Sequence, residues 1–355
     1  MSAREILALG IETSCDDTAC AVVTGQGEVL SSLVSSQLAA HRPFGGVVPE
    51  IASREHLRNW PAVSKAALEE AGIALQDVSV VAATKGPGLI GSLLVGLSLG
   101  KSIAYALGTS FQAVHHLEGH LYSPFLKGPG ERAEIPPEEF VGLVVSGGHT
   151  SVFQVAKGSM VTLAETRDDA MGEVFDKVGK RLNLPYPQGP VVDRLAEAGI
   201  ADEKRFSIAR FSDGSVDFSF SGLKSQTLLE IRRLEADGIE TDLGDYETHP
   251  PSQSVLDLLA SFRTAAIAQI LDRLDRLQSI KPFGLLAVSG GVAANRLLRP
   301  RLEQWARDRT VDIRLVPMVY AGDNAAMIAH AGIRRHRNGI EDDPLTSDAA
   351  SRLPL

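Results

Sequence analysis

The stretch "ILALGIETSCDDTACAVVT" (residues 6–24) decides the fold, because two β-rich runs flank a polar Thr-Ser-Cys-Asp-Asp turn. Apolar runs of this kind on either side of a short polar turn predict a β-hairpin. The stretch "FVGLVVSGGHTSVFQV" (residues 140–155) has the same plan, with Gly147 and Gly148 at its tip. The sequence therefore predicts two similar hairpins, one in each half of the chain.

The elements that follow each hairpin also repeat in order. "VSVVAAT" (residues 78–84) predicts a buried strand, and the apolar segment from residue 86 onward predicts a long helix. Later, "FGLLAVSGG" (residues 283–291) predicts a strand and a Gly-Gly turn before a further helix. The two halves share this plan without close sequence repetition. We therefore expect a duplicated α/β fold with two lobes and a central cleft.

The same pattern sets the expected domain limits, which follow the polar, Gly- and Pro-rich segments of the chain. We expect an N-terminal lobe at 1–126, completed by a helix at about 323–337, a linker at 127–139, a C-terminal lobe at 140–322, and a poorly ordered polar tail at 338–355.

Composition narrows the function class. The chain has 355 residues, 44% of them hydrophobic, and a net charge of −9, so a basic nucleic-acid surface is not indicated by the totals. Its two cysteines fit a reducing compartment, and we expect a cytoplasmic protein. We expect neither a signal peptide nor a transit peptide, and because no run of about 18 apolar residues occurs, we also expect no membrane span.

Three histidines lie close together in "AVHHLEGHLYS" (residues 113–123). His116 and His120 are four residues apart, which places both rings on one face of a helix, where they can share a metal ion. His115 lies about 100° around the helix, so we expect it to be structural. Glu118 comes two residues after His116 and faces away, which argues against an H-E-x-x-H zinc protease.

This pair still needs a third ligand with an oxygen or nitrogen donor. Asp323, in "AGDNAAMIAH", is the candidate. The alternative is that this carboxylate only caps the helix that follows it.

Two Gly-Gly turns suggest a phosphate-bearing ligand. "VSGGHT" (residues 145–150) and "VSGGV" (residues 288–292) each let backbone amides approach an anion closely. The second turn precedes a helix whose N-terminus favours phosphate, and Asn295 is expected in its first turn, facing a base or ribose. A single Gly-Gly pair is more often only a turn, so the prediction of a phosphate-bearing ligand depends on the presence of both turns.

The segment "DDAMGEVFDKVGKRLNLPYPQGPVVDRLA" (residues 168–196) adds polar candidates. Asp176 and Asp193 can accept hydrogen bonds from ribose hydroxyls; the alternative is that both are carboxylates on a helix surface. Gly189 lies in a Pro-rich turn, where the backbone can come close to a ligand. Several basic residues could form a local rim that binds RNA phosphates, although such charges more often form a solvated face. They are Lys177, Lys180, Arg181, Arg194, Arg296, Arg299 and Arg301.

Two other patterns are weak. "GPGLIG" (residues 86–91) matches G-x-G-x-x-G, but no acidic residue follows before Glu118 to hold a ribose. "GLSLGKS" (residues 96–102) resembles a phosphate-binding loop but lies within an apolar helical pattern. We interpret both as close helix packing.

Taken together, the motifs resemble the tRNA threonylcarbamoyladenosine transferase family (TsaD-like, bacterial and organellar branch, formerly described as glycoprotein endopeptidases). They occur in family order over nearly the whole chain, to about residue 330. The matching stretches are "LGIETSCDDTACAVV", "FGGVVPEIASREH", "GPGLIGSLLVG", "HLEGH", "LVVSGGHTSV", "GEVFDKVGKRLNLPYPQGP", "DFSFSGLKS", "SGGVAANRLLR" and "DNAAMIA".

The resemblance implies the actin–hexokinase–heat-shock-ATPase fold. It implies transfer of a threonylcarbamoyl group from threonylcarbamoyl-adenylate to N6 of adenosine 37 in tRNAs reading ANN codons, releasing AMP. It implies one metal ion, Fe²⁺ or else Zn²⁺, on His116, His120 and Asp323. A smaller same-fold paralogue and an accessory ATPase are the implied partners. The residues implied to hold the adenylate are Val144, Val145, Ser146, Gly147, Gly148, His149, Asp176, Gly189, Asp193 and Asn295.

The adenine amine is a weak nucleophile, so the donor must be an activated mixed anhydride, and a carboxylate could then take the proton that the amine loses. We hypothesise Asp16 or Asp17 for this role. The family usually has Asp-Glu-Thr where this chain has Asp16-Asp17-Thr18, which puts the role of Asp17 in question. It also usually has Pro-Gly-Gly-Pro where Gln188 precedes the retained Gly189 here. The loop at residues 235–252 is longer than expected, and we interpret it as a partner or tRNA surface.

Two other function classes remain open from the sequence. A small-molecule kinase of the same fold explains the glycine turns but leaves His116 and His120 unexplained. A nucleotide-binding scaffold without chemistry should have lost these histidines and the "SGGHT" turn, and both are present.

Overall fold

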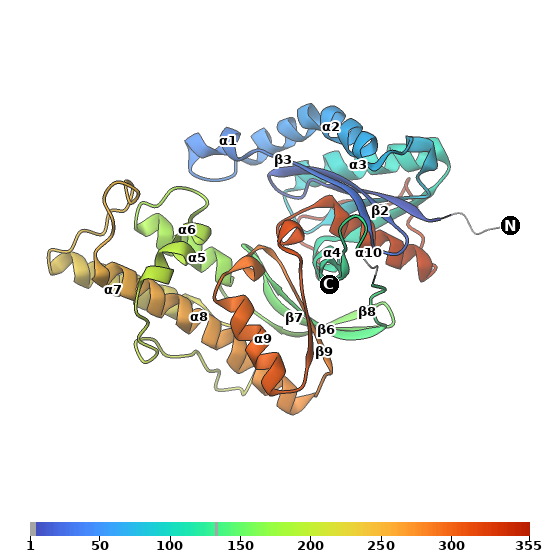
Figure 1. The fold of residues 1–355 in the computed structure, drawn as a ribbon. Coiled ribbons are helices and arrows are strands. Elements are labelled where there is room, and N and C mark those ends of the chain that lie inside the picture. Colours follow the sequence, from blue (N-terminus) through green and yellow to red (C-terminus); the bar gives the residue numbers. More distant parts are fainter. Residues whose placement is uncertain (1–4, 132–133) are drawn as a thin grey trace. The chain divides into compact units, whose positions relative to one another are not determined.

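The computed structural model describes residues 5–131 and 134–355. These residues form two compact units, each described below by itself (Figure 1). Within the described residues, unit 1 comprises Met1–Glu139, Val155–Met160 and Val316–Leu355, and unit 2 comprises Phe140–Gln154 and Val161–Leu315. The predicted linker at 127–139 falls within unit 1, and the C-terminal part of that unit starts at Val316.

Unit 1 is built on a five-stranded sheet with the strand order β3-β2-β1-β4-β5. Its strands are β1 (Leu7–Glu12), β2 (Asp17–Thr24), β3 (Val29–Ser36), β4 (Val80–Gly86) and β5 (Ser110–His115). The predicted hairpin is present, because β1 pairs antiparallel with β2. The central strands β1 and β4 pair in parallel and are almost wholly buried, which explains their continuous apolar runs.

Helices cover both faces of this sheet. They are α2 (Pro49–Ala71), α3 (Ile90–Leu107), α4 (His116–Tyr122) and α10 (Ala325–Arg337), and the short α1 (Leu38–His41) lies between β3 and α2 in the chain. Leu9 and Ile11 of β1 join the hydrophobic core with Trp60 of α2 and Leu97 of α3. Gly10 faces the opposite side, where α10 packs so closely that a Cβ would lie 2.0 Å from the Ala325 carbonyl oxygen.

The glycines of the two weak patterns, residues 86–91 and 96–102, are explained by close packing, as the sequence analysis interpreted them. A Cβ on Gly88 would lie 2.4 Å from the Ser14 carbonyl oxygen, and a Cβ on Gly96 would lie 2.2 Å from Thr13 Oγ1. Gly96 and the rest of residues 96–102 lie inside α3, so no loop is available there to hold a phosphate.

The C-terminal tail, which its polarity predicts to be poorly ordered, makes defined contacts with the rest of unit 1. Gln112 Nε2 donates to the Ile340 carbonyl at 2.7 Å, and the Asp342 carboxylate accepts from Ala113 N at 2.9 Å. Further along, Ala350 N donates to the Lys85 carbonyl at 2.8 Å. The tail is held because β5 is an edge strand, whose backbone and side-chain polar groups need partners.

Unit 2 repeats the same sheet plan, with the strand order β10-β9-β6-β7-β8. Its strands are β6 (Glu139–Val145), β7 (Thr150–Ala156), β8 (Ser159–Glu165), β9 (Leu285–Ser289) and β10 (Asp312–Leu315). As in unit 1, the first three strands follow one another across the sheet, and the fourth pairs in parallel with the first. The predicted duplication is therefore confirmed at the level of topology.

Five helices belong to unit 2: α5 (Met171–Arg181), α6 (Gln188–Leu195), α7 (Ser221–Ala236), α8 (Gln253–Ile280) and α9 (Leu298–Asp308). The 28-residue α8 contacts α6, α7 and α9. Its apolar residues recur at helical spacing and are buried, so α8 is the central helix of this unit.

Helices α3 and α8 are each long and apolar enough to cross a membrane by length and composition alone, although the sequence predicts no span. Such helices also form the cores of soluble proteins, so two of them are weak evidence. α8 is mostly buried. By contrast, α3 leaves Ile90, Leu94 and Tyr105 exposed, which gives unit 1 an apolar outer face.

Candidate metal centre and ligand pocket

The junction of β5 and α4 positions the histidines. His115 caps α4, because its Nδ1 accepts a hydrogen bond from Leu117 N at 3.1 Å. Its Nε2 therefore carries the proton and donates to the Leu353 carbonyl at 2.9 Å. Burial lowers the pKa of His115 to about 4, so the ring stays neutral. His115 is structural, as the sequence predicts.

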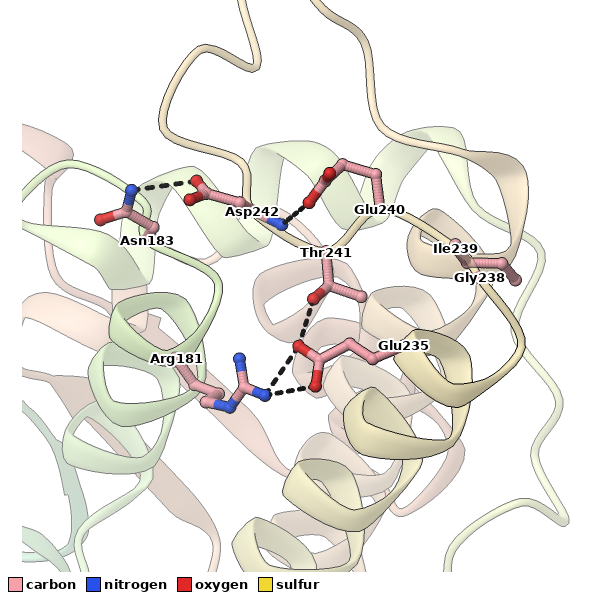
Figure 2. Close-up of a pocket in the computed structure, with 8 residues that line it drawn as sticks. All are labelled: Arg181, Asn183, Glu235, Gly238, Ile239, Glu240, Thr241 and Asp242. Carbon is pink, nitrogen blue, oxygen red and sulfur yellow. Dashed lines mark hydrogen bonds and ion pairs between the residues drawn. The ribbon is translucent and has the colours of Figure 1, made fainter.

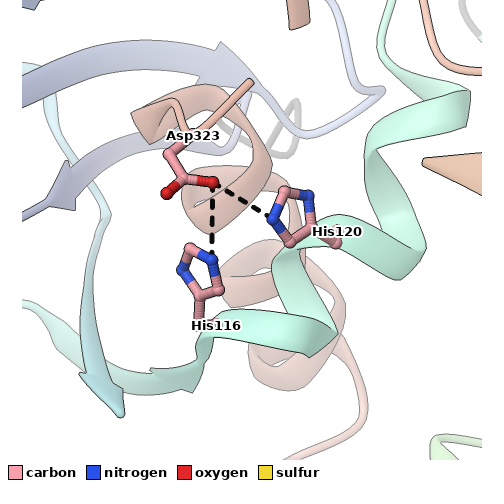
Figure 3. Close-up of side chains that lie close together, drawn as sticks. All are labelled: His116, His120 and Asp323. Atoms are coloured by element: carbon pink, nitrogen blue, oxygen red, sulfur yellow. Dashed lines mark ion pairs between the residues drawn. The ribbon is translucent and has the colours of Figure 1, made fainter. Parts of the chain in front are cut away.

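His116 and His120 face one another and Asp323 within unit 1 (Figure 3). Their ring centroids are 4.7 Å apart. Asp323 Oδ1 lies 3.5 Å from His116 Nε2 and 3.2 Å from His120 Nε2. The three ligand atoms all lie within 4.8 Å of one another, so this group can hold a metal ion.

Asp323 is not the cap of the helix that follows. Asn324 is the N-cap of α10, and its side chain accepts from Met327 N at 2.9 Å. The alternative in which Asp323 serves only as a cap is therefore wrong. Its carboxylate is left facing the two histidines.

The surroundings of the triad fit a cation. His120 is fully buried, and its Nδ1 has no hydrogen-bond partner among the described residues. Burial raises the pKa of Asp323, but the neighbouring His116 outweighs this and holds that pKa well below its usual range. Burial lowers the pKa of His116, yet Asp323 and Glu12 raise it well above its ordinary value. The buried Glu12 and the partly exposed Asp323 thus favour positive charge at this place, which a divalent ion can supply.

Glu12 is the residue that the sequence analysis missed here. It is the last residue of β1, is 1% exposed, and lies 3.1 Å from His116 Nδ1 through Oε2. The sequence feature that could have identified Glu12 is the position of a carboxylate at the end of an otherwise apolar strand.

The turn with Asp16 and Asp17 is fixed by buried hydrogen bonds. His56 Nδ1 accepts from Thr18 Oγ1 at 2.8 Å, so its Nε2 donates to the Cys15 carbonyl at 3.1 Å. Asp17 Oδ1 is buried without a hydrogen-bond partner among the described residues. Burial raises the pKa of Asp17 to about 6, which suits a proton acceptor at neutral pH.

Unit 2 holds a pocket of about 410 Å³ that collects five predicted ligand residues. They come from the β6–β7 turn, α5, α6 and the segment before α9: Gly147, Asp176, Gly189, Asp193 and Asn295.

The other five predicted residues do not line this pocket. Val144 and Val145 are buried in β6. Ser146, Gly148 and His149 lie in the turn after it, where Ser146 N donates to the His149 carbonyl at 2.8 Å.

Two carboxylates of the pocket already bind protein groups. Asp176 Oδ1 accepts from Gly189 N at 2.7 Å. Asp193 Oδ1 accepts from Asn295 Nδ2 at 2.7 Å and from the buried Arg263 at 3.1 Å. In this structure Asp193 therefore holds the pocket wall together.

The second Gly-Gly turn differs from its predicted geometry. A short 3-10 turn, Gly291–Ala294, follows β9, and α9 begins only at Leu298. Asn295 thus precedes α9 instead of lying in its first turn, and its Oδ1 accepts from Leu298 N at 2.9 Å. Gly290 has φ +92°, and a Cβ there would lie 2.3 Å from the Val145 carbonyl oxygen. The glycine is needed for this close approach.

The proposed basic rim is largely compensated by ion pairs. Lys177 pairs with Asp169 at 2.5 Å, and Arg296 pairs with Glu197 at 2.8 Å. Arg181 pairs in the same way with Glu235 at 2.7 Å. These charges fit a solvated face better than a surface for RNA phosphates.

A second cavity of unit 2, of about 500 Å³, lies between the end of α5 and the loop after α7 (Figure 2). Its polar groups bond to one another: Arg181 and Thr241 donate to Glu235, and Asn183 donates to Asp242. With Glu240 also in its lining, carboxylates outnumber the single arginine. This cavity is therefore a poor site for an anionic nucleotide.

The repeated topology defines a protein of the actin–hexokinase–heat-shock-ATPase fold class. The chain is similar to HypF of T. kodakarensis, with a TM-score of 0.60 and 15% identity over 96% of this chain and 49% of that one. It is also similar to component A of (R)-2-hydroxyglutaryl-CoA dehydratase from Acidaminococcus fermentans, with a TM-score of 0.52 and 15% identity over 94% and 99%. These likenesses show the fold alone.

Sequence comparison defines the family. The family model described as "TsaD: tRNA N6-adenosine threonylcarbamoyltransferase" matches residues 28–330. A protein of that name from Syntrophobacter fumaroxidans is 45% identical over 98% of this chain and 99% of its own length. Another, from Clostridioides difficile, is 40% identical over 96% of each chain. The chain therefore belongs to the tRNA N6-adenosine threonylcarbamoyltransferase family, and it is an enzyme that forms threonylcarbamoyladenosine in tRNA.

Proposed function

We propose that the enzyme takes its acyl group from threonylcarbamoyl-adenylate and attaches it to N6 of adenosine 37 in tRNAs that read ANN codons. The amine nitrogen attacks the carbonyl carbon of the mixed anhydride, the bond to the phosphate oxygen breaks, and AMP leaves. The amine loses one proton in this step. The observation that carries the proposal is the His116–His120–Asp323 group, which the kinase and scaffold alternatives leave without a purpose.

The triad is proposed to bind one Fe²⁺ ion, with Zn²⁺ as the alternative. Two imidazoles and one carboxylate are the donor set used both by non-haem iron sites and by catalytic zinc sites. When bound, the ion supplies positive charge for an oxygen that becomes negative during acyl transfer. His116 and His120 offer ring nitrogens, and Asp323 offers a carboxylate oxygen.

The pocket of unit 2 is proposed to hold the adenylate. Its apolar lining suits the face of a flat base and includes Phe175, Pro187, Pro190 and Val292. Asp176 and Asn295 place polar atoms in the same lining. The amides of the turn at residues 144–149 are proposed to bind the phosphate, since Cβ positions on Gly147 and Gly148 meet open space.

Asp17 is proposed as the proton acceptor, ahead of Asp16. Its Oδ1 is buried and has no bonding partner among the described residues, so the oxygen is available to accept a proton. Its pKa of about 6, raised by burial, keeps the carboxylate mostly ionised at pH 7 and more basic than an exposed aspartate.

Protein partners are proposed to assist the reaction: a smaller same-fold paralogue and an accessory ATPase. The exposed apolar side chains of α3 support a protein contact on unit 1. The loop at residues 235–252 has neither lysine nor arginine, so we favour a protein over tRNA phosphates as its partner. Its acidic residues are Glu235, Asp237, Glu240, Asp242, Asp245 and Glu247.

The test is to incubate the full-length protein with threonylcarbamoyl-adenylate and unmodified tRNA, with and without the two partners. The tRNA is then digested, and its nucleosides are measured by mass spectrometry. We expect a threonylcarbamoyladenosine peak at position 37 that is missing with His116→Ala. No product with all partners and metal present would overturn the proposed donor, and product at another position would overturn the proposed site of modification.

A further inference from the structure

Glu12 is a buried carboxylate with a complete set of hydrogen-bond donors around it. It ends β1 and is 1% exposed, and burying such a charge is costly unless it is paired and hydrogen-bonded. Oε1 accepts from Ser14 N at 2.5 Å. Oε2 lies 2.6 Å from Thr84 Oγ1 and 3.1 Å from His116 Nδ1.

These contacts determine which nitrogen of His116 carries the proton. A metal ion binds only the neutral form of an imidazole, which has one N–H donor and one acceptor nitrogen. A carboxylate only accepts, so Nδ1 must donate to Glu12, and the lone pair is left on Nε2. It is His116 Nε2 that lies 3.5 Å from Asp323 Oδ1. A second contact of Nδ1, to Ser14 Oγ, is longer at 3.4 Å.

We propose that Glu12 is a positioning residue that fixes the tautomer and ring orientation of His116, so that Nε2 is presented to the metal ion. This inference rests on the metal site of the proposed function. Ligand histidines commonly donate their second N–H to a carboxylate in this way, and loss of such a partner weakens metal binding by roughly 10- to 100-fold.

The other ligand histidine has no such support. His120 Nδ1 lacks a hydrogen-bond partner among the described residues, so the only polar contact of this ring is that of Nε2 with Asp323 at 3.2 Å. Glu118 provides the contrast on the same helix. It is equally buried, but its carboxylate contacts Arg335 at 3.3 Å and no ligand histidine. Of these two glutamates, Glu12 alone acts on the triad.

Three substitutions test whether Glu12 positions His116 or only supports the fold. In Glu12→Gln, a neutral amide replaces the carboxylate, and its NH₂ must face either Ser14 N or the Thr84 and His116 side. On the second side it favours an unprotonated Nδ1, which moves the proton to Nε2 and blocks metal binding. Glu12→Asp keeps the charge and should restore part of the affinity. Glu118→Gln is the matched control.

The experiment measures the affinity of the full-length, metal-free protein for Zn²⁺ by competition with a chromophoric chelator. We expect Glu12→Gln to weaken Zn²⁺ binding by about 10- to 100-fold and Glu12→Asp by less. The Glu118→Gln control should keep the wild-type affinity. In samples labelled with ¹⁵N-histidine and held at a pH at which the histidines are neutral, long-range ¹H–¹⁵N spectra should show that Glu12→Gln removes one Nδ1–H tautomer.

The His116→Ala variant distinguishes failure of the proposed metal site from failure of the proposed role of Glu12. If Zn²⁺ binds this variant as well as the wild type, the proposed metal site is wrong, and the inference falls with it. If His116→Ala loses Zn²⁺ while a folded Glu12→Gln binds it with wild-type affinity, only the role of Glu12 is overturned. Equal losses in Glu12→Gln and Glu118→Gln would also overturn it, because they would indicate general destabilisation.

Discussion

At the scale of single residues, the site depends on carboxylates that are wholly or partly buried. Glu12 and Asp323 face His116 from two sides, and Asp17, the first residue of β2, has a buried oxygen. Each costs free energy to bury in its ionised form. Such a cost must be offset by hydrogen bonds, by a counter-charge or by a bound ligand, and clusters of such groups are common at functional positions.

Replacing Asp17 by Asn should separate stability from activity. The pKa of Asp17 is raised from 3.8 to about 6, so the folded state holds its proton more tightly than the unfolded state. This carboxyl therefore stabilises the fold below about pH 4, and the contribution is lost as the pH rises through 6. At pH 7.5, Asp17→Asn should be more stable by about 1–3 kcal/mol, and the difference should vanish below pH 4.

Urea unfolding of both proteins across this pH range checks the stability claim. In the transfer assay, Asp17→Asn should be at least about 100-fold slower, and the wild-type rate should fall as the pH drops through 6. Asp16→Asn is the matched comparison. A variant that gains stability yet keeps full activity would remove Asp17 from the mechanism.

Arg263 should be essential to the pocket of unit 2. Its side chain is mostly buried, and it donates to both the carboxylate and the carbonyl of Asp193 and to the Ala196 carbonyl. Arg263→Met leaves Asp193 buried without its cation, so we expect a loss of about 3–5 kcal/mol in unfolding free energy. The exposed Arg181, replaced by Met, should cause little change. Equal unfolding curves for the two variants would contradict this account of Asp193.

At the scale of elements, local patterns were predicted well and distant contacts were not. The spacing of His116 and His120 follows from helix geometry, which the sequence carries locally. Glu12 was missed because Thr84 and His116 lie 72 and 104 residues further along the chain. The Asn295 geometry was wrong because a 3-10 turn, Gly291–Ala294, intervenes before α9.

The C-terminal tail gives a prediction at this scale. Its polar composition indicates disorder, yet Asp342 binds both Ala113 N and Arg335 at 2.9 Å. Removing residues 340–355 exposes the edge of β5 and should lower the unfolding free energy on the order of 2–5 kcal/mol, since several hydrogen bonds are lost. Removing only Pro354 and Leu355 is the control.

Thermal and urea unfolding would measure the effect of this truncation. Because the tail also binds His115 through the Leu353 carbonyl, the longer truncation should weaken Zn²⁺ binding as well. An unchanged unfolding midpoint would show that the tail contacts contribute no stability.

At the scale of the whole molecule, the repeated strand order is the feature that the sequence predicted best. Two hairpins with apolar runs, each followed by a further strand and a helix, were enough to predict a duplicated α/β fold. The chemistry is not duplicated. Unit 1 carries the His-His-Asp group, and unit 2 carries the pocket that contains Asp176 and Asn295. The two units therefore share a sheet topology but carry different functional side chains.

The central claim is that this chain transfers the threonylcarbamoyl group with one metal ion on His116, His120 and Asp323. The most direct measurement titrates Fe²⁺ anaerobically into the metal-free protein, with its partners, and follows threonylcarbamoyladenosine formed in tRNA. Product should rise with metal and level off at one ion per chain, and His120→Ala should form almost none at any metal concentration. Full activity without metal, or undiminished activity of His120→Ala, would contradict the account.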